Sequence, residues 1–166
     1  EMCIRDRYYT VISAFSRKCR ILARELNIIQ EIQEVITTMR STNSIIMSIN
    51  PTGKVPALIT NEEQLITESY AICNYLEKIT KTNINSDNNH DNWKINGYET
   101  VACQVLESIV YRSIEKKNKP KDFIYGATTD YEKFKVNRAL DFLEKKAPEF
   151  NSSINRVQIT ICLAFN

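Results

Sequence analysis

The sequence has a single histidine, no Cys-x-x-Cys pair and no long apolar run, and each absence disfavours a class of protein. His90 lies in the polar segment 87–92, where we expect a solvated loop rather than a catalytic base. This disfavours a serine or cysteine hydrolase with a histidine base. The five cysteines are scattered along the chain and odd in number: Cys3, Cys19, Cys73, Cys103 and Cys162. This pattern disfavours a zinc site or a disulfide scaffold and favours reduced thiols in a cytosolic protein.

The sequence also lacks a large excess of one charge, since it has 22 Lys and Arg residues and 20 Asp and Glu residues, which gives a net charge of +2. A nucleic-acid partner, which needs a clustered basic surface, is therefore not expected. No stretch approaches the ~20 apolar residues of a membrane span, so no membrane partner is expected either. The opening residues 1–7 are charged and lack the apolar segment of a secretory signal. We expect these residues to be a non-native leader.

What is present is 166 residues of ordinary globular composition, 43% of them hydrophobic, enough for one domain or two small ones. Residues 8–80 mix strand patterns with amphipathic helical patterns. A strand over 8–12 is followed by a helix whose apolar stripe runs from Phe15 to Leu26. The remaining patterns are a strand over 34–39, a less regular segment over 44–49, a hairpin of strands over 55–60 and 64–67, and a helix from residue 68 or 69. The predicted order is βαβαββα.

The second half is predicted to be all helical. A polar, asparagine-rich connector lies within the linker 81–92 and separates a first domain, residues 8–80, from a second, residues 93–166. Two long helices end near Pro120 and Pro148, and a third begins in the apolar tail, with Ser152 or Ser153 as its cap. A helix that is apolar on most sides needs neighbours all round. We therefore expect the helical domain to be incomplete at the C-terminus.

The turn Ser13–Ser16, between the first strand and the first helix, is a candidate site. A hydroxyl here can cap the helix, which we expect of Ser16, or reach a ligand, which we expect of Ser13. A helix N-terminus favours anions. Together with one hydroxyl hydrogen bond it can move a thiol pKa of about 8.5 towards neutrality.

Two further segments carry polar groups suited to a small peptide ligand. In residues 50–58, a cis bond before Pro56 would free the main chain of Val55 to pair with an extended peptide; the alternative is a plain loop that enters a strand. In residues 67–69, the Glu68–Ser69 pair can cap a helix. It can also bind a ligand, with Ser69 taking a carboxylate and Glu68 an ammonium. The predicted topology brings all three segments to one edge of a small sheet.

Residues 13–21, 50–58 and 68–72, together with their spacing, resemble the glutathione transferase family. The resemblance implies an α/β thioredoxin-like domain that binds glutathione, followed by an all-α domain. It also implies that Pro56 is cis and that Val55 pairs with the cysteinyl part of glutathione. Glu68 and Ser69 would then hold the γ-glutamyl end, with Lys54 nearby.

The serine-type branches of this family place their thiolate-stabilising hydroxyl where Ser13 falls, so Ser13 is the expected catalytic residue and Ser16 the runner-up. No cysteine lies in the turn, which disfavours the branches that work through a mixed disulfide. Tyr8, Tyr9 and Cys19 are interpreted as packing residues. The resemblance implies a bacterial, cytoplasmic homodimer that conjugates glutathione to a small electrophile without a metal. Two alternatives remain: a non-catalytic interaction module of the starvation-protein type, and a glutathione-dependent isomerase or dehalogenase.

Overall fold

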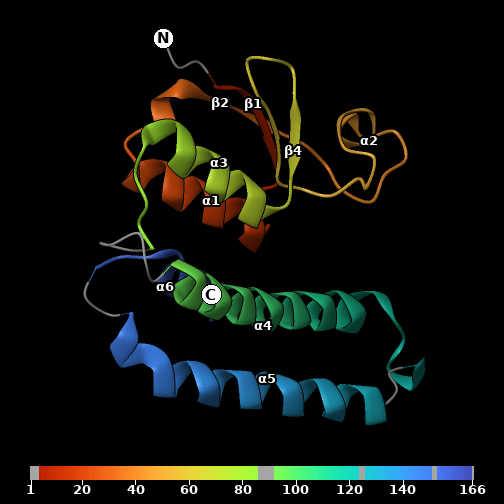
Figure 1. The fold of residues 1–166 in the computed structure, drawn as a ribbon. Helices are drawn as coiled ribbons and strands as arrows, with labels where there is room; N and C mark the ends of the chain where they lie inside the picture. Colours follow the sequence, from red (N-terminus) through yellow and green to blue (C-terminus); the bar gives the residue numbers. More distant parts are fainter. Residues whose placement is uncertain (1–3, 86–91, 124–125, 151–152, 166) are drawn as a thin grey trace. The chain divides into compact units, whose positions relative to one another are not determined.

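The computed structural model describes residues 4–85, 92–123, 126–150 and 153–165 (Figure 1). The chain divides into two compact units, Glu1–Asn83 and Ile84–Asn166, and the division falls within the predicted linker. Three residues singled out from the sequence, Cys3, His90 and Ser152, lie outside the described residues.

The first unit is built on a four-stranded sheet with the strand order β2-β1-β3-β4. β1 (Ile4–Tyr9) pairs in parallel with β2 (Ile32–Ile36) and antiparallel with β3 (Ala57–Ile59), which pairs antiparallel with β4 (Leu65–Thr67). Three helices complete the unit, and α1 lies beside α3 in Figure 1: α1 (Ala14–Glu25), α2 (Ile45–Ile49) and α3 (Ser69–Thr80). The order βαβαββα is that of a thioredoxin-like domain, as predicted.

The predicted apolar stripes form the core of this unit. In α1, Cys19 and Leu22 are fully buried, and the Sγ atom of Cys19 lies 4.0 Å from that of Cys73 in α3. On the other face of the sheet, Ile46 of α2 packs in one cluster with Tyr8 and other buried residues of the strands. The packing roles predicted for Tyr8 and Cys19, and likewise for Tyr9, are confirmed by their burial.

The first strand begins earlier than the sequence pattern predicts. The apolar residues Val11 and Ile12, which we assigned to it, follow the strand and are 61% and 85% exposed. Residues 4–7, which belong to the predicted leader 1–7, form the first part of β1, and Asp6 and Arg7 pair with both β2 and β3. β2 is also shifted, to Ile32–Ile36 from the predicted 34–39. Pairing with neighbouring strands therefore outweighs local apolar content here.

An ion pair accompanies the burial of Arg7 of β1 in the sheet. Arg7 is fully buried, pairs with Glu34 of β2 and donates a hydrogen bond to the carbonyl of Ser16 at 3.2 Å. Glu34 also accepts two hydrogen bonds from Arg20, at 2.9 and 3.0 Å. Burial, the largest influence, lowers the pKa of Arg7 to about 10, which leaves it protonated at neutral pH.

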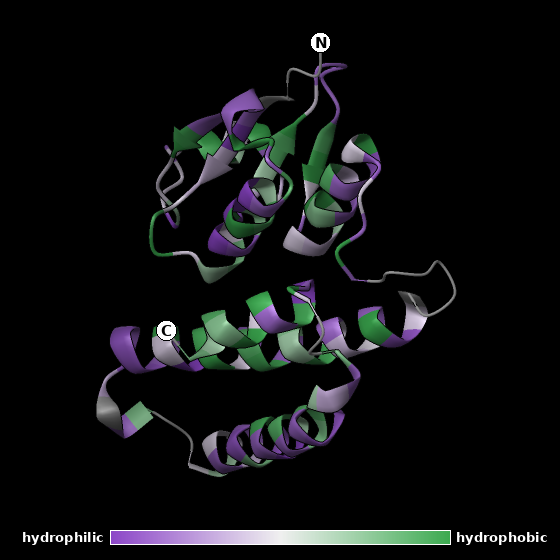
Figure 2. Cartoon of the chain, turned by 90° about the vertical axis from the view of Figure 1, so that its left-hand side faces the viewer, coloured by the Kyte–Doolittle hydropathy of each residue, from purple (hydrophilic) through white to green (hydrophobic). Residues whose placement is uncertain are grey.

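The second unit is helical, as predicted. α4 (Asn92–Asn118) packs against both α5 (Gly126–Lys146) and α6 (Arg156–Ala164). The helices of this unit carry both hydrophobic and hydrophilic residues, as Figure 2 shows. The apolar cluster of this unit contains Ile95, Tyr98, Ala102, Leu143, Phe150 and Val157. No helix among the described residues combines the length and apolar character that a membrane span requires.

The cap of α6 differs from the prediction. Asn155, rather than Ser152 or Ser153, is the N-cap residue. Its side-chain oxygen accepts a hydrogen bond from the Gln158 N–H at 3.0 Å, and the Gln158 side chain accepts one from the Asn155 N–H at 3.1 Å. This reciprocal capping box satisfies two backbone donors that the helix leaves unpaired.

A buried polar cluster joins α4 and α6 within this unit. Glu99 and Arg156 are almost fully buried and form an ion pair of 2.6 Å. The side-chain amide of Asn85 donates to Glu99 at 3.2 Å and to Asn96 at 2.9 Å, and its oxygen accepts from the Arg156 N–H at 2.9 Å. These hydrogen bonds satisfy charged and polar groups that would otherwise be costly to bury.

A second charged cluster, around Glu149, gives the stability of this unit a predicted pH dependence. The Glu149 carboxylate accepts a hydrogen bond from Tyr98 at 2.7 Å and pairs with Lys94 at 2.6 Å and Lys146 at 2.9 Å. These contacts, led by that with Lys94, lower the pKa of Glu149 from 4.5 to about 2. A pKa depressed in the folded state adds stability at higher pH, which is lost as the pH falls from about 4.5 to 2.

The variant Glu149→Gln is therefore expected to be less stable than the parent at neutral pH, with the difference shrinking as the pH falls towards 2. Urea unfolding of both proteins across this range measures the effect. The matched control is Glu144→Gln, a change at an exposed position of α5. A parent–variant difference for Glu149→Gln that stays constant with pH would contradict the prediction.

Candidate functional site

The three predicted segments meet because of the register of the sheet. Tyr8 of β1 pairs with Ala57 of β3, and Ala57 pairs with Thr67 of β4. One row across the sheet therefore joins the end of β1, the start of β3 and the end of β4. The turn that carries Ser13 follows β1, Pro56 precedes β3, and Glu68 follows β4. The predicted convergence at one sheet edge is thus what the strand pairing produces.

Ser13 is the N-cap residue of α1. Its Oγ atom accepts a hydrogen bond from the Ser16 N–H at 3.2 Å, and its own N–H donates to the Thr10 carbonyl at 3.2 Å. These bonds fix the half-buried side chain at the positive end of the helix. A hydroxyl that accepts still has its own hydrogen to donate. The Ser13 hydroxyl can therefore cap α1 through its oxygen and donate its hydrogen to a ligand at the same time. From the sequence alone these two roles are alternatives.

Ser16 does not have the capping role that we expected of it. It lies inside the first turn of α1 and is fully buried. Within the described residues its Oγ atom has no hydrogen-bond partner, while its main-chain carbonyl accepts the bond from Arg7. A side chain with no exposed surface is poorly placed to contact a ligand, which weakens the case for Ser16 relative to Ser13.

The loop before β3 is organised by Asn50, a residue that our sequence analysis did not single out. Its side-chain amide donates to the Lys54 carbonyl at 2.8 Å, and its oxygen accepts from the N–H and the hydroxyl of Thr52 at 3.1 and 3.0 Å. Gly53 has a φ of +63°, and a Cβ atom there would lie 2.6 Å from the Sδ atom of Met47. An asparagine that starts a Pro- and Gly-containing turn is a known signal, and it could have identified Asn50.

The end of this loop has the backbone form that the resemblance implied. The Val55–Pro56 bond is cis, and both residues are buried, whereas the side chain of Lys54 is exposed. Among the described residues, no backbone hydrogen bond outside the helices and strands involves Val55. The described part of the chain thus supplies no such backbone partner for the N–H or the C=O of Val55.

The start of α3 brings a carboxylate and a hydroxyl to the same edge. Glu68 occupies the N-cap position but makes no side-chain capping bond, so the capping interpretation is wrong for its carboxylate. Its backbone has a φ of 68° and a ψ of 133°, a conformation that costs a non-glycine residue about 1–3 kcal/mol. Ser69 is buried, and its carbonyl accepts a weak bond from the Cys19 thiol at 3.7 Å. Strained backbone of this kind is concentrated at functional sites.

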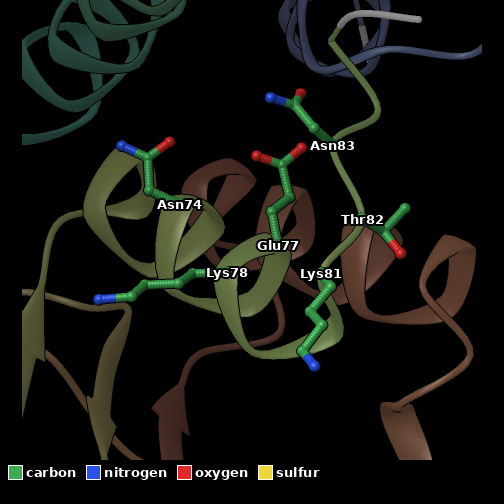
Figure 3. Close-up of a pocket in the computed structure, with 6 residues that line it drawn as sticks. All are labelled: Asn74, Glu77, Lys78, Lys81, Thr82 and Asn83. Atoms are coloured by element: carbon green, nitrogen blue, oxygen red, sulfur yellow. The ribbon is translucent and has the colours of Figure 1, made fainter. Parts of the chain in front are cut away.

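A separate hollow of about 290 Å³ lies over the C-terminal half of α3 (Figure 3). Its lining is polar and includes none of the residues of the sheet edge: Asn74, Glu77, Lys78, Lys81, Thr82 and Asn83. Among the described residues, no group of three or more histidine, cysteine, aspartate or glutamate side chains is placed to hold a metal ion.

Comparison with known proteins identifies a family match for the first unit. Residues 12–79 match the family described as glutathione S-transferase, N-terminal domain. No curated protein sequence matches the chain.

Solved structures extend the similarity to both units. A glutathione transferase family member from Pseudomonas fluorescens Pf-5, with bound glutathione, is 21% identical; the alignment covers 96% of this chain and 80% of that one, with a TM-score of 0.87. A glutathione S-transferase from Methylobacillus flagellatus KT, with GSH bound, is also 21% identical; the alignment covers 96% of this chain and 80% of that one, with a TM-score of 0.85. Glutathione S-transferase 1-6 from Anopheles dirus species B is 21% identical; the alignment covers 96% of this chain and 77% of that one, with a TM-score of 0.77. The chain thus has the fold of glutathione transferases.

Proposed function

We propose that this protein is a glutathione transferase of the serine type, which conjugates the thiolate of glutathione to a small electrophile. The observation that carries the proposal is the row Tyr8–Ala57–Thr67, which brings the turn of Ser13, the main chain of Val55 and the start of α3 to one sheet edge. A hydroxyl at a helix N-terminus, the main chain of Val55 and a carboxylate beside a second helix N-terminus suit the thiol, the cysteinyl main chain and the γ-glutamyl end of this tripeptide.

The central part of glutathione is an extended peptide, and Val55 is proposed to bind it. The main-chain N–H and C=O of Val55 would pair with the cysteinyl residue in the manner of an added strand. Pro56, which follows, has no N–H to compete for the ligand. The exposed ammonium of Lys54 lies in the same segment and would attract a carboxylate of the tripeptide.

The γ-glutamyl end carries both an ammonium and a carboxylate, and α3 begins with groups that complement them. Glu68 would accept the ammonium, because its carboxylate is exposed and makes no capping bond. The Ser69 hydroxyl and the N-terminus of α3 would take the carboxylate, since a helix N-terminus favours anions. The strained backbone of Glu68 would be compensated by this binding role.

Ser13 is proposed to stabilise the thiolate. Its hydroxyl hydrogen would donate to the sulfur while its oxygen keeps the cap of α1. One hydrogen bond to a charged group contributes about 1.5–3 kcal/mol, and each pKa unit corresponds to about 1.4 kcal/mol. The bond and the helix dipole together are therefore sufficient to lower a thiol pKa of about 8.5 by one to two units. A pre-ionised nucleophile held beside its electrophile accounts for the rate gain.

The proposal includes a cytoplasmic location, where reduced glutathione is available, and a homodimer. Exposed apolar side chains of α2 and β4, such as Met47 and Leu65, are surface that a second copy would cover.

Calorimetric titration with glutathione tests the proposal directly. In the calorimetric titration we expect saturable binding. An ultraviolet pH titration of the complex should show the thiolate absorbance below the pH at which free glutathione ionises, and an activity assay should show conjugation of a chlorodinitroarene. Cysteinylglycine, which lacks the γ-glutamyl group, is the matched ligand and should bind more weakly because Glu68 and Ser69 lose their partners. Absence of glutathione binding would overturn the proposal. Binding without thiolate formation or conjugation would favour the non-catalytic interaction module instead.

A further inference from the structure

The orientation of one peptide group in the loop before β3 is set by a buried side chain. Asn50 is almost fully buried, and its side-chain amide donates to the Lys54 carbonyl at 2.8 Å. That carbonyl belongs to the same peptide unit as the Val55 N–H. Because a trans peptide is planar, its C=O and N–H point in opposite directions. A bond that holds the Lys54 carbonyl towards Asn50 therefore directs the Val55 N–H away from Asn50.

Asn50 is itself held firmly. Its own N–H donates to the carbonyl of Ile46 in α2 at 2.8 Å, and its carbonyl accepts from the Gly53 N–H at 2.8 Å. Its side-chain oxygen accepts two bonds from Thr52. With both side-chain ends occupied, the amide has one orientation, in which only the nitrogen faces the Lys54 carbonyl.

We propose that Asn50 is a positioning residue for ligand binding, which aims the Val55 N–H at the cysteinyl carbonyl of glutathione. The inference rests on the proposed function, since it assigns a purpose to Val55 within that site. Asn50 would not touch the ligand. Its contribution would be preorganisation: the donor is oriented before binding, so no conformational freedom is lost when glutathione arrives.

The variant Asn50→Asp separates this role from general support of the loop. Aspartate keeps the acceptor for both bonds from Thr52 but has no donor for the Lys54 carbonyl. We expect the dissociation constant for glutathione to rise about tenfold, the effect of one lost hydrogen bond. The pKa of the bound thiol should not change, because Ser13 lies on a different element. The control Thr52→Val removes one bond to Asn50 but leaves the bond to Lys54, and its dissociation constant should change less than about twofold.

A measurement on the parent protein keeps the inference testable if Asn50→Asp fails to fold. With ¹⁵N-labelled valine, the Val55 amide resonance should shift downfield as glutathione binds. In a folded Asn50→Asp variant the shift should be much smaller. An unmoved Val55 resonance in the parent, or an aspartate variant that binds as tightly as the parent, would overturn the role of Asn50. Failure of the parent to bind glutathione would instead overturn the proposed function.

Discussion

Replacement of Ser13 by alanine is expected to raise the pKa of the thiol of bound glutathione by about one unit or more. The variant loses the half-buried hydroxyl at the N-cap of α1, and Ser16, which is fully buried, is not placed to replace it. At neutral pH a smaller fraction of the thiol is then ionised, and kcat/KM should fall about tenfold in consequence. Ultraviolet titration of the thiolate in the complex measures the pKa, and the conjugation rate measures the consequence.

Because Ser13 also caps α1, the alanine variant loses stability, by about 1 kcal/mol for a typical N-cap. Ser13→Gly separates the two effects: glycine is a tolerated N-cap but has no hydroxyl, so the thiol pKa should rise with little loss of stability. Ser13→Thr retains the hydroxyl and should retain the low pKa. Ser16→Ala is the control for the runner-up position and should leave the pKa unchanged. A low thiol pKa in Ser13→Gly would remove Ser13 from the proposed role.

The second large effect is expected for stability rather than for binding. Glu99→Ala should lower the free energy of unfolding by about 3–5 kcal/mol, because it removes the carboxylate that forms an ion pair with the buried, charged Arg156. The same change removes an acceptor from Asn85. Urea unfolding followed by far-ultraviolet circular dichroism is a suitable measurement, since the second unit is helical.

Two comparisons sharpen this test. Glu107→Ala, an exposed change on the same helix, should alter the free energy of unfolding by about 0.5 kcal/mol or less. The double variant Glu99→Leu, Arg156→Met removes both charges and should recover most of the loss. If Glu99→Ala were no more damaging than Glu107→Ala, the buried pair would not contribute to stability as the structure indicates.

Much of this arrangement could be predicted from local pattern. The apolar stripe around Cys19 and Leu22 predicts α1 because a helix must bury one face, and that face is buried. The order of elements and the segments of the sheet edge were also predicted, since turn residues and periodicity are local properties. The positions of Ser13, Val55 and Glu68 relative to the strands then follow from the order of elements.

Other features depend on partners distant in the chain, and no local pattern contains them. The sequence alone predicts that Arg7 is part of a charged leader. In the structure Arg7 is buried, and it pairs with Glu34 on a neighbouring strand. Tertiary packing likewise distinguishes the two serines of one turn: Ser13, the cap, is half-buried, whereas Ser16 is fully buried. The physical reason is shared: periodicity and turn chemistry act over a few residues, whereas the burial of a charge or a hydroxyl depends on which groups the completed fold brings to it.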